Sequence, residues 1–168
     1  MGFTSFSFRP QIEAGIQACG YTAPTPIQQQ TMPPALAGSD VMGLAQTGTG
    51  KTAAFVLPIL QRLSEGPRGR VRALILAPTR ELAEQILEAV TELGRSTGIR
   101  GVAVYGGVSK EMQLQKIRRG VEIMVACPGR LLDHLQAGAF RLDKVEVLVL
   151  DEGGQMFDMG FLPDIRRI

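Results

Sequence analysis

The chain has 168 residues, of which 45% are hydrophobic and 20% charged, and its formal net charge is +2. This length suits one domain of ordinary size, roughly 100–200 residues, and the composition is that of a globular protein with ample material for a core. So small a net charge does not by itself indicate a nucleic-acid partner. Two cysteines, Cys19 and Cys127, stand far apart and in no CxxC pair. This spacing favours reduced thiols over a disulfide or a metal site.

The first residues lack a basic region followed by an apolar stretch, so no signal peptide is predicted. The myristoylation pattern fails because Phe6 stands where Ser or Thr is needed. No run approaches the roughly 18 apolar residues of a membrane span. We therefore expect a cytoplasmic protein with no membrane partner.

Apolar runs short enough for strands alternate along the chain with segments of helical period. Strands are predicted at residues 41–45, 73–77, 101–105, 122–126 and 145–150, and helices at 51–63, 80–93, 110–119 and 130–137. Such alternation predicts an α/β fold, a parallel β-sheet with helices on both faces. The clearest helix is 80–93, where Leu82, Ile86 and Val90 share one face.

The predicted strand 41–45 leads directly into a glycine-rich segment that resembles a P-loop, with Ala45 in place of its usual first Gly. The segment reads Gln46-Thr47-Gly48-Thr49-Gly50-Lys51-Thr52. Its glycines allow successive backbone N–H groups to point at phosphates, and the following helix offers a positive N-terminus. Lys51 would neutralise the β- and γ-phosphates, and the Thr52 hydroxyl would ligate Mg²⁺.

An acidic pair, Asp151-Glu152, follows the apolar strand 145–150. In a phosphate-transfer site Asp151 would hold Mg²⁺, and Glu152 would orient or deprotonate the attacking water. Lys51, Asp151 and Glu152 are therefore the candidate catalytic residues, and Thr52 and Asp151 the candidate metal ligands. A solvated strand end is the structural alternative for the acidic pair.

Together these segments and several others resemble the motifs of the DEAD-box RNA helicases. The matching segments are Gly20–Gln28 with upstream Phe3 (Q motif), Ala45–Thr52 (motif I), Pro78-Thr79-Arg80-Glu81-Leu82-Ala83 (motif Ia), Gly106-Gly107 (GG motif), Pro128-Gly129-Arg130 (motif Ib), Asp151-Glu152 (motif II) and Met159-Gly160-Phe161 beyond it. The resemblance covers nearly the whole chain. It implies a RecA-like P-loop NTPase domain, of which residues 1–168 would be the N-terminal part, with the Q motif at about 3–28.

The resemblance implies that the chain binds ATP with Mg²⁺ through its Q motif and motif I. A Gln side chain offers a donor and an acceptor to the N6 and N7 edge of adenine, so Gln28 could select ATP over GTP. Tyr21 or Phe3 could pack on the base. The predicted nucleotide-binding residues are Phe3, Tyr21, Thr25, Gln28, Ala45, Gln46, Thr47, Gly48, Thr49, Gly50, Lys51 and Thr52.

The resemblance also implies RNA as a partner, bound without sequence preference through phosphates and 2′-hydroxyls. Its predicted contacts are Pro78, Thr79, Arg80, Gly106, Gly107, Pro128, Gly129 and Arg130. All of them are expected in loops and helix starts that follow strand ends. For Arg80 and Arg130, helix caps and surface charges are the structural alternatives.

The chain departs from the family pattern in three places. Motif II should read Asp-Glu-Ala-Asp, but Gly153-Gly154 follows the acidic pair, and Cys127 stands where motif Ib usually has Thr. The lost carboxylate would link the nucleotide site to RNA binding, so nucleotide binding should survive better than hydrolysis. The sequence ends at Ile168, so motif III and the second RecA-like domain, with its arginine fingers, are expected to be missing. A gap would then open in the sheet, between the strands that precede motifs I and II.

The expected function is therefore that of the ATP-binding domain of an ATP-dependent RNA helicase, which couples ATP hydrolysis to duplex unwinding. This chain should bind adenine nucleotide and, weakly, RNA without unwinding it. One alternative is a catalytically silent nucleotide- and RNA-binding module, which Gly153-Gly154 would favour. Another is a P-loop ATPase that acts on protein partners, against which motifs Ia and Ib speak.

Overall fold

The structure is a computed structural model that describes residues 2–46 and 48–168. Four strands form one parallel sheet in the order β2-β3-β1-β4. The strands are β1 (Ala73–Leu76), β2 (Gly101–Val104), β3 (Ile123–Ala126) and β4 (Val147–Leu150). The register aligns their last residues, so all four carboxyl ends reach the same edge of the sheet.

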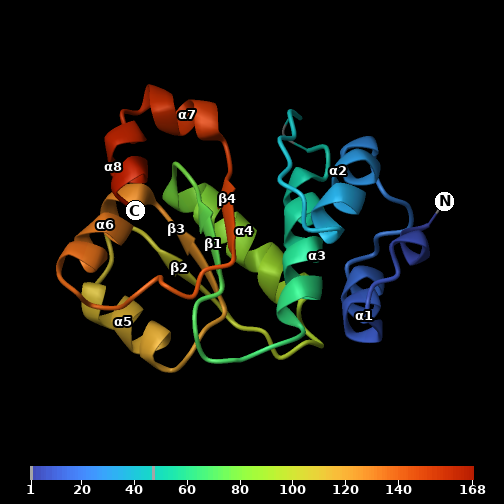
Figure 1. Cartoon of the computed structure of the whole chain (residues 1–168), viewed down its shortest axis with the longest axis horizontal. Helices are drawn as coiled ribbons and strands as arrows, with labels where there is room; N and C mark the ends of the chain where they lie inside the picture. Colours follow the sequence, from blue (N-terminus) through green and yellow to red (C-terminus); the bar gives the residue numbers. More distant parts are fainter. Residues whose placement is uncertain (1, 47) are drawn as a thin grey trace. The chain divides into compact units, whose positions relative to one another are not determined.

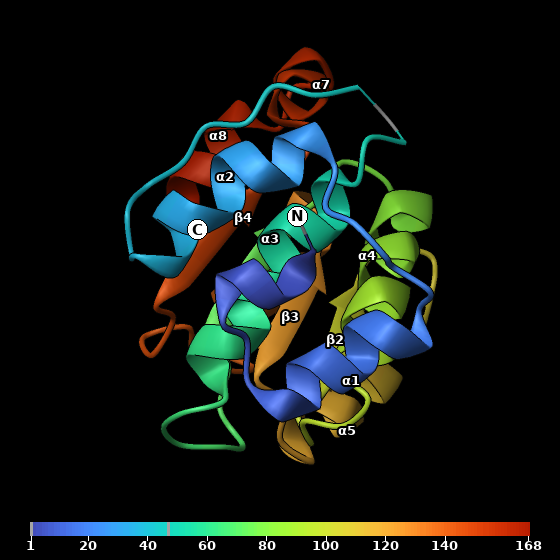
Figure 2. The same cartoon turned by 90° about the vertical axis from the view of Figure 1, so that its right-hand side faces the viewer.

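Helices occupy the segments before, between and after the strands (Figures 1 and 2). They are the 3₁₀ helix η1 (Phe3–Phe6) and the α-helices α1 (Pro10–Ala18), α2 (Pro26–Leu36), α3 (Lys51–Leu63), α4 (Arg80–Leu93), α5 (Lys110–Arg118), α6 (Pro128–Gln136), α7 (Gly153–Asp158) and α8 (Leu162–Arg167). The predicted α/β class, a parallel sheet surrounded by helices, is confirmed.

The chain divides into two compact units. The first contains the residues up to Gly66 together with Ala89–Ile99, and the second contains Pro67–Glu88 and Arg100–Ile168. The phosphate-loop segment therefore belongs to the first unit, whereas the whole sheet, with the segments that follow its strands, belongs to the second.

The core of the second unit lies on one face of the sheet. Leu74, Val102 and Met124 point into it from the strands, and helices α5–α8 lie together on this side in Figure 1. Leu131 of α6 and Met156 of α7 are fully buried there. The strand residues that alternate with these, such as Ile75, Ile123 and Val125, are equally buried. Burial on both faces explains why the central strands read as continuous apolar runs.

At the amino edge of the sheet, buried charged side chains bond to the chain segments that enter the strands. The Glu122 carboxylate is 1% exposed and accepts the N–H groups of Gly69 and Arg100, at 2.7 and 2.8 Å. Arg72 pairs with Glu146, with 2.5 Å between Nε and Oε2. Buried charges are stable only when they are paired or hydrogen-bonded in this way.

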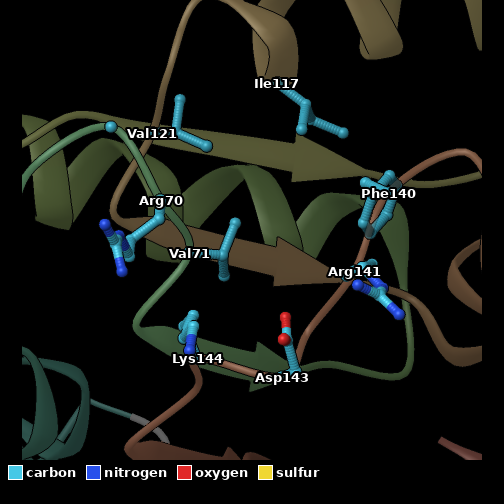
Figure 3. A pocket seen from close by; sticks show the side chains of 9 residues that line it. Arg70, Val71, Ile117, Val121, Phe140, Arg141, Asp143 and Lys144 are labelled. Atoms are coloured by element: carbon cyan, nitrogen blue, oxygen red, sulfur yellow. The ribbon is translucent and has the colours of Figure 1, made fainter.

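A hollow of about 190 Å³ also lies at this amino edge (Figure 3). Its lining is partly apolar and partly charged, with Val71, Ile117, Val121, Phe140, Arg70, Arg141, Asp143 and Lys144 around it. Ligands of parallel sheets bind at the carboxyl ends of the strands, which is the opposite edge. The hollow is therefore separate from the predicted functional loops.

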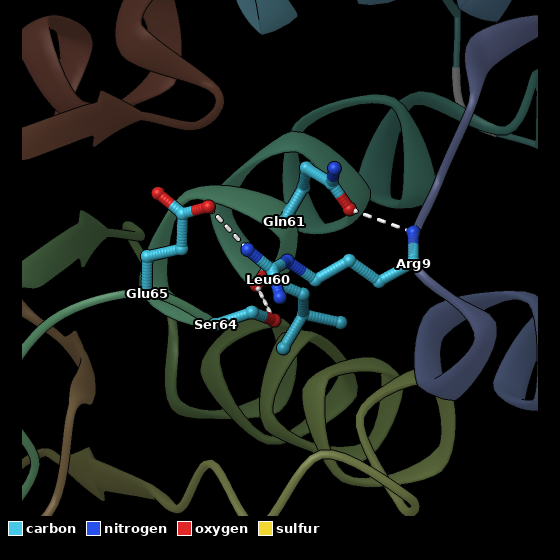
Figure 4. Close-up of polar contacts among 5 residues, drawn as sticks. All are labelled: Arg9, Leu60, Gln61, Ser64 and Glu65. Carbon is cyan, nitrogen blue, oxygen red and sulfur yellow. Dashed lines mark hydrogen bonds and ion pairs between the residues drawn. The ribbon is translucent and has the colours of Figure 1, made fainter.

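The first unit is helical and contains a very close helix contact. A Cβ atom on Gly15 of α1 would stand 2.0 Å from the carbonyl oxygen of Leu93, so only glycine fits there. The N-terminal segment is tied to the end of α3 by Arg9, whose N–H donates to Gln61 Oε1 at 3.1 Å and whose guanidinium pairs with Glu65 (Figure 4). Packing between helices thus organises this unit.

The prediction of a strand at residues 41–45 is wrong. Residues 41–46 form neither a strand nor a helix, and Met42 and Leu44 are each 89% exposed. A strand is stable only when its backbone groups are paired, and none of the described strands pairs with this segment. On the sheet, β4 is an edge strand whose Leu148 and Leu150 are exposed.

The other predicted elements differ from the observed ones mainly at their ends. Helices 51–63 and 80–93 are observed with the predicted bounds, and the four remaining strands are each one or two residues shorter. Helices η1, α1, α2, α7 and α8 were not predicted. None of the helices within residues 2–46 and 48–168 combines the length and hydropathy that a bilayer crossing requires.

Candidate functional site

Four loops at the carboxyl edge of the sheet contain most of the predicted functional residues. β1 leads into Pro78–Arg80, β2 into Gly106-Gly107, β3 into Pro128–Arg130 and β4 into Asp151-Glu152. The strand order sets the loops side by side in the sequence GG, Ib, Ia and II. The predicted RNA contacts are therefore brought together at one edge, within one compact unit.

The two predicted arginines flank the glycine pair. A Cβ atom on Gly107 would stand 3.6 Å from Arg80 Nη1, and one on Gly106 would stand 4.0 Å from Arg130 Nη2. Gly107 has φ +86°, a left-handed conformation that favours glycine. Between two guanidinium groups, an exposed glycine backbone leaves room for a phosphate oxygen to approach from several directions.

Arg80 is held over an aromatic ring. Its guanidinium carbon lies 5.1 Å from the centroid of Tyr105, and the Tyr105 hydroxyl donates to Glu84 Oε1 at 2.5 Å. This hydrogen bond is the main cause of a raised pKa at Tyr105. Thr79 accepts the N–H of Leu82 at 3.2 Å, so it caps α4 as well as preceding Arg80. A cation over a ring keeps its charge while its rotation is restricted.

A cluster of polar groups bonds to the Arg130 guanidinium. Its Nη1 donates to the Val108 carbonyl at 2.9 Å and to Gln113 Oε1 at 3.3 Å. Gln113 is also bonded to His134 and to the Tyr105 carbonyl. Burial is the largest cause of a lowered pKa at His134, and the nearby charges of Arg130 and Lys110 lower it further.

The remaining residues of the RNA prediction shape the loops. Pro78 and Pro128 are buried, and Pro128 occupies the first position of α6. Cys127 is the N-cap of this helix and makes no capping bond through its side chain. Burial, with a smaller effect from Glu81, raises the pKa of the Cys127 thiol to about 11. The thiol is therefore protonated at neutral pH and a poor nucleophile.

The acidic pair stands where β4 ends. Asp151 is 4% exposed, and its backbone N–H continues the ladder to the Leu76 carbonyl at 2.9 Å. The N–H of Glu152 donates to Asp151 Oδ1 at 3.1 Å, and Glu152 has φ +52°. Left-handed backbone at a residue other than glycine is strained, and such strain often marks functional positions. Gly153 and Gly154 are the first residues of helix α7 and do not lie in a loop.

The phosphate-loop residues lie at the start of α3 in the first unit. Gly48 and Gly50 have φ +87° and +81°, and Lys51 and Thr52 open a helix of 13 residues. Thr49 Oγ1 donates to the Gln46 carbonyl at 2.6 Å, which tightens the turn. Thr47 lies outside the described residues. A long helix that begins behind left-handed glycines suits a polyphosphate, although the predicted strand before it is absent.

Gln28 contacts this loop from α2. Its Nε2 donates to the Gly50 carbonyl at 3.1 Å, and its Oε1 accepts the Thr25 N–H at 3.0 Å. A Gln amide has two donor hydrogens and two acceptor lone pairs, so one of each remains. Thr25 is the N-cap of α2 and forms a capping box with Gln28, so both residues are fixed beside the phosphate loop.

The two predicted base-stacking aromatics are stacked on each other. The rings of Phe3 and Tyr21 have centroids 6.2 Å apart, with an interplanar angle of 27°. Phe3 is 5% exposed and Tyr21 41%. Only Tyr21 therefore offers an accessible ring face.

Three residues that contact the predicted RNA-binding arginines or their partners were not predicted: Tyr105, Gln113 and His134. Tyr105 adjoins the glycine pair, and its position after a strand end could have suggested it. Gln113 and His134 lie on helices that read as ordinary surface helices, so their burial at 5% and 2% depends on tertiary packing.

The sequence is similar to known proteins over nearly its whole length. The profile of the DEAD/DEAH box helicase family matches residues 25–168. The chain is 48% identical to the DEAD-box ATP-dependent RNA helicase 30 of Arabidopsis thaliana over 171 residues, which cover 99% of this chain and 29% of that protein. It is 46% identical to the helicase CshA of Streptococcus pneumoniae strain R6, over 100% of this chain and 32% of that protein. It is also 46% identical to the ATP-dependent RNA helicase RhlB of Xanthomonas oryzae, over 98% and 30%. The chain thus spans about three tenths of these relatives.

Proposed function

Because the chain belongs to the DEAD/DEAH box helicase family, we propose that it is the ATP-binding part of an ATP-dependent RNA helicase. The proposed parent activity couples ATP hydrolysis to unwinding of RNA duplexes. The 168-residue chain itself would bind adenine nucleotide and RNA, the latter weakly, without separating strands. The observation that most strongly supports this is the row of four motif loops at one edge of the sheet.

The proposed nucleotide site is assigned residue by residue from the motifs that the chain shares with this family. In it, the N–H groups at the start of α3 and the Lys51 ammonium would hold the phosphates, and Gln28 would read adenine with its remaining donor and acceptor. Thr52 and Asp151 would hold Mg²⁺, which supplies charge neutralisation at the phosphates. Glu152 would accept a hydrogen bond or a proton from the attacking water. Tyr21 would provide the exposed ring for the base.

The proposed RNA site lies on the second unit alone. Arg80 and Arg130 would bind successive phosphates of one RNA strand on either side of Gly106-Gly107. The backbone N–H groups of the two glycines would donate to the same RNA strand. No described side chain in these loops suits a base edge better than a phosphate, which is consistent with binding that ignores sequence. Unwinding would require the second RecA-like domain, since an arginine finger is worth about 10³–10⁵ in rate.

Titration calorimetry tests the nucleotide assignment. ADP should bind more tightly than GDP at equal Mg²⁺. The Lys51→Ala substitution should weaken the binding of ADP more than the binding of AMP, because AMP has no β-phosphate for the ammonium to contact. Equal affinities for ADP and GDP would remove Gln28 as the base reader.

Fluorescence anisotropy with a labelled single-stranded RNA tests the RNA assignment. Affinity should fall as salt rises, and each lost phosphate contact should reduce the slope of log affinity against log salt by about 0.7. Arg80→Ala and Arg130→Ala should each show that reduction. An affinity that is indifferent to salt would contradict the assigned role of both arginines.

A catalytically silent binding module is the second candidate function. Gly153-Gly154 supports it, because the carboxylate that would follow the acidic pair is missing. Asp151 and Glu152 are present, so metal and water would keep their partners. Steady-state ATPase measurements on the parent protein, with and without RNA, distinguish the two candidates.

A further inference from the structure

The buried side chain of Gln113 connects the segment after β2, whose Tyr105 ring lies beneath Arg80, to helix α6, which carries Arg130. Gln113 lies on α5 and is 5% exposed. Its Nε2 donates to the Tyr105 carbonyl at 2.7 Å, and its Oε1 accepts from Arg130 Nη1 at 3.3 Å and from the His134 ring at 3.1 Å. One amide therefore contacts the end of β2 and helix α6 together.

The orientation of this amide follows from its partners. The Tyr105 carbonyl can only accept, so the nitrogen of the amide must face it, and Oε1 faces Arg130 and His134. His134 Nε2 must then carry its hydrogen, and the lowered pKa keeps the ring neutral. Both acceptor positions of Gln113 Oε1 are filled, and both donors, Arg130 and His134, lie on helix α6. The arrangement leaves Arg130 little freedom to rotate.

Gln113 also contacts Arg80 indirectly, through Tyr105. Its hydrogen bond fixes the backbone of Tyr105, and the ring of Tyr105 lies beneath the Arg80 guanidinium. The Arg130 group reaches back to the Val108 carbonyl, on the far side of the glycine pair. Tyr105 and Val108 are thus held at both ends of Gly106-Gly107.

We propose that Gln113 is a positioning residue for RNA binding, which holds Arg130 directly and Arg80 through Tyr105 on either side of Gly106-Gly107. The proposal rests on the proposed RNA function of these loops. A long side chain that is free to rotate loses entropy when it binds a phosphate, and a preformed hydrogen bond removes that loss beforehand. Two exposed glycines have no rigidity of their own, so bonds at both ends of the pair supply it.

The test replaces the amide by an apolar side chain of similar length. Gln113→Met should weaken binding of single-stranded oligouridine, measured by anisotropy at fixed salt, about five- to twentyfold. Gln115→Met is the matched control, because Gln115 is an exposed residue of the same helix. The control should bind as the unchanged chain does. Thermal unfolding establishes that both variants are folded at the temperature of the assay.

A double-mutant cycle separates positioning from general damage. If Gln113 acts mainly through Arg130, adding Gln113→Met to the Arg130→Ala variant should lower its affinity for RNA by only about twofold or less. Arg130→Lys is a milder second variant that keeps the charge but loses the planar fork. It should weaken RNA binding about five- to twentyfold, and this measurement can be made whether or not Gln113→Met folds.

The outcomes distinguish failure of this proposal from failure of the RNA function. If Arg80→Ala and Arg130→Ala leave affinity unchanged, the proposed RNA surface is wrong. If these variants bind weakly but Gln113→Met and Arg130→Lys bind normally, the surface stands and the positioning role is overturned. Equal losses from Gln113→Met with and without Arg130 would likewise overturn it.

Discussion

The contact between Gln28 and Gly50 shows how closely the phosphate loop is packed in the first unit. Gly50 combines φ +81° with a position where a Cβ atom would stand 2.5 Å from Gln28 Nε2 and 3.0 Å from Thr25 Oγ1. The carbonyl of the same glycine accepts the hydrogen bond from Gln28 Nε2. A side chain at 50 would therefore disturb both the backbone and the proposed base reader.

We predict that Gly50→Ala destabilises the chain by about 2–4 kcal/mol and weakens ADP binding at least about tenfold. Gly48→Ala is the control for stability, since Gly48 has φ +87° but no atom within 4 Å of an added Cβ. It should lose only the conformational part, about 1–2 kcal/mol. Chemical denaturation measures both. Equal losses at the two positions would show that displacing Gln28 contributes nothing.

The neutral ring of His134 predicts a pH dependence of stability. Its pKa is lowered by burial first and by Arg130 and Lys110 next, while Asp133 acts in the opposite direction. The folded state then binds fewer protons than the unfolded state below the ordinary His pKa, about 6.5. This contribution to stability is fully present above about pH 6.5 and declines as the pH falls.

We therefore expect the free energy of unfolding to fall between about pH 7 and pH 5.5. His134→Gln should make that decline shallower, because a Gln amide can donate to Gln113 without titrating. Denaturant titrations at several pH values measure it. A slope that is the same in both proteins would rule out His134 as its source.

Among the elements, α6 begins without a side-chain cap although its family counterparts usually have Thr there. Cys127 is the N-cap, with extended φ and ψ of −85° and 136°, and it makes no capping bond. By contrast, Ser109 caps α5 by accepting the N–H of Met112 at 3.4 Å. A thiol is a weak acceptor, whereas a hydroxyl satisfies one of the free N–H groups at a helix start.

Replacing Cys127→Thr should stabilise the chain by about 0.5–1.5 kcal/mol. Ser109→Ala, which removes an existing cap, should destabilise it by about 1 kcal/mol. Both changes are read from midpoints of denaturant unfolding. A destabilised Cys127→Thr variant would mean that the buried environment of the thiol outweighs the gain of the cap.

At the scale of the whole molecule, activity depends on groups that must act together. Gly153 and Gly154 have no positive φ, and a Cβ added at either would meet nothing within 4 Å. The side chains of the family motif therefore fit sterically at both positions. The missing carboxylate would act between motifs, where its geometry matters more than its charge.

Restoring Gly153→Ala with Gly154→Asp should leave ATPase activity of the 168-residue chain nearly unchanged. In a protein that also carries motif III and the second RecA-like domain, it should raise RNA-stimulated ATPase about 10–100-fold, or about 1.4–3 kcal/mol. ATP affinity should change much less. Gly153→Ala alone is the control for helix propensity in α7. Identical rates in the longer protein would mean that the glycine pair is tolerated.

The sequence by itself determined the alternation of strands and helices, the parallel sheet and the loops that contain the motifs. Strands 73–76 and 123–126 are apolar throughout, and α4 has a single apolar face, so local patterns sufficed. The glycine pair, Arg80 and Arg130 were predicted as RNA contacts from the resemblance to the DEAD-box helicases, and parallel strands deliver their following residues to one edge.

Tertiary structure alone decided what these elements pair with and what holds the site. Residues 41–46 have the composition of a strand, but pairing requires a neighbour that local sequence does not show. Gln113 and His134 have polar side chains on helices, and only the packing of α5 and α6 against the sheet buries them. Gln28 is likewise internal because α2 lies beside α3. Contacts between distant segments depend on the whole fold, and burial then gives each polar group a specific partner.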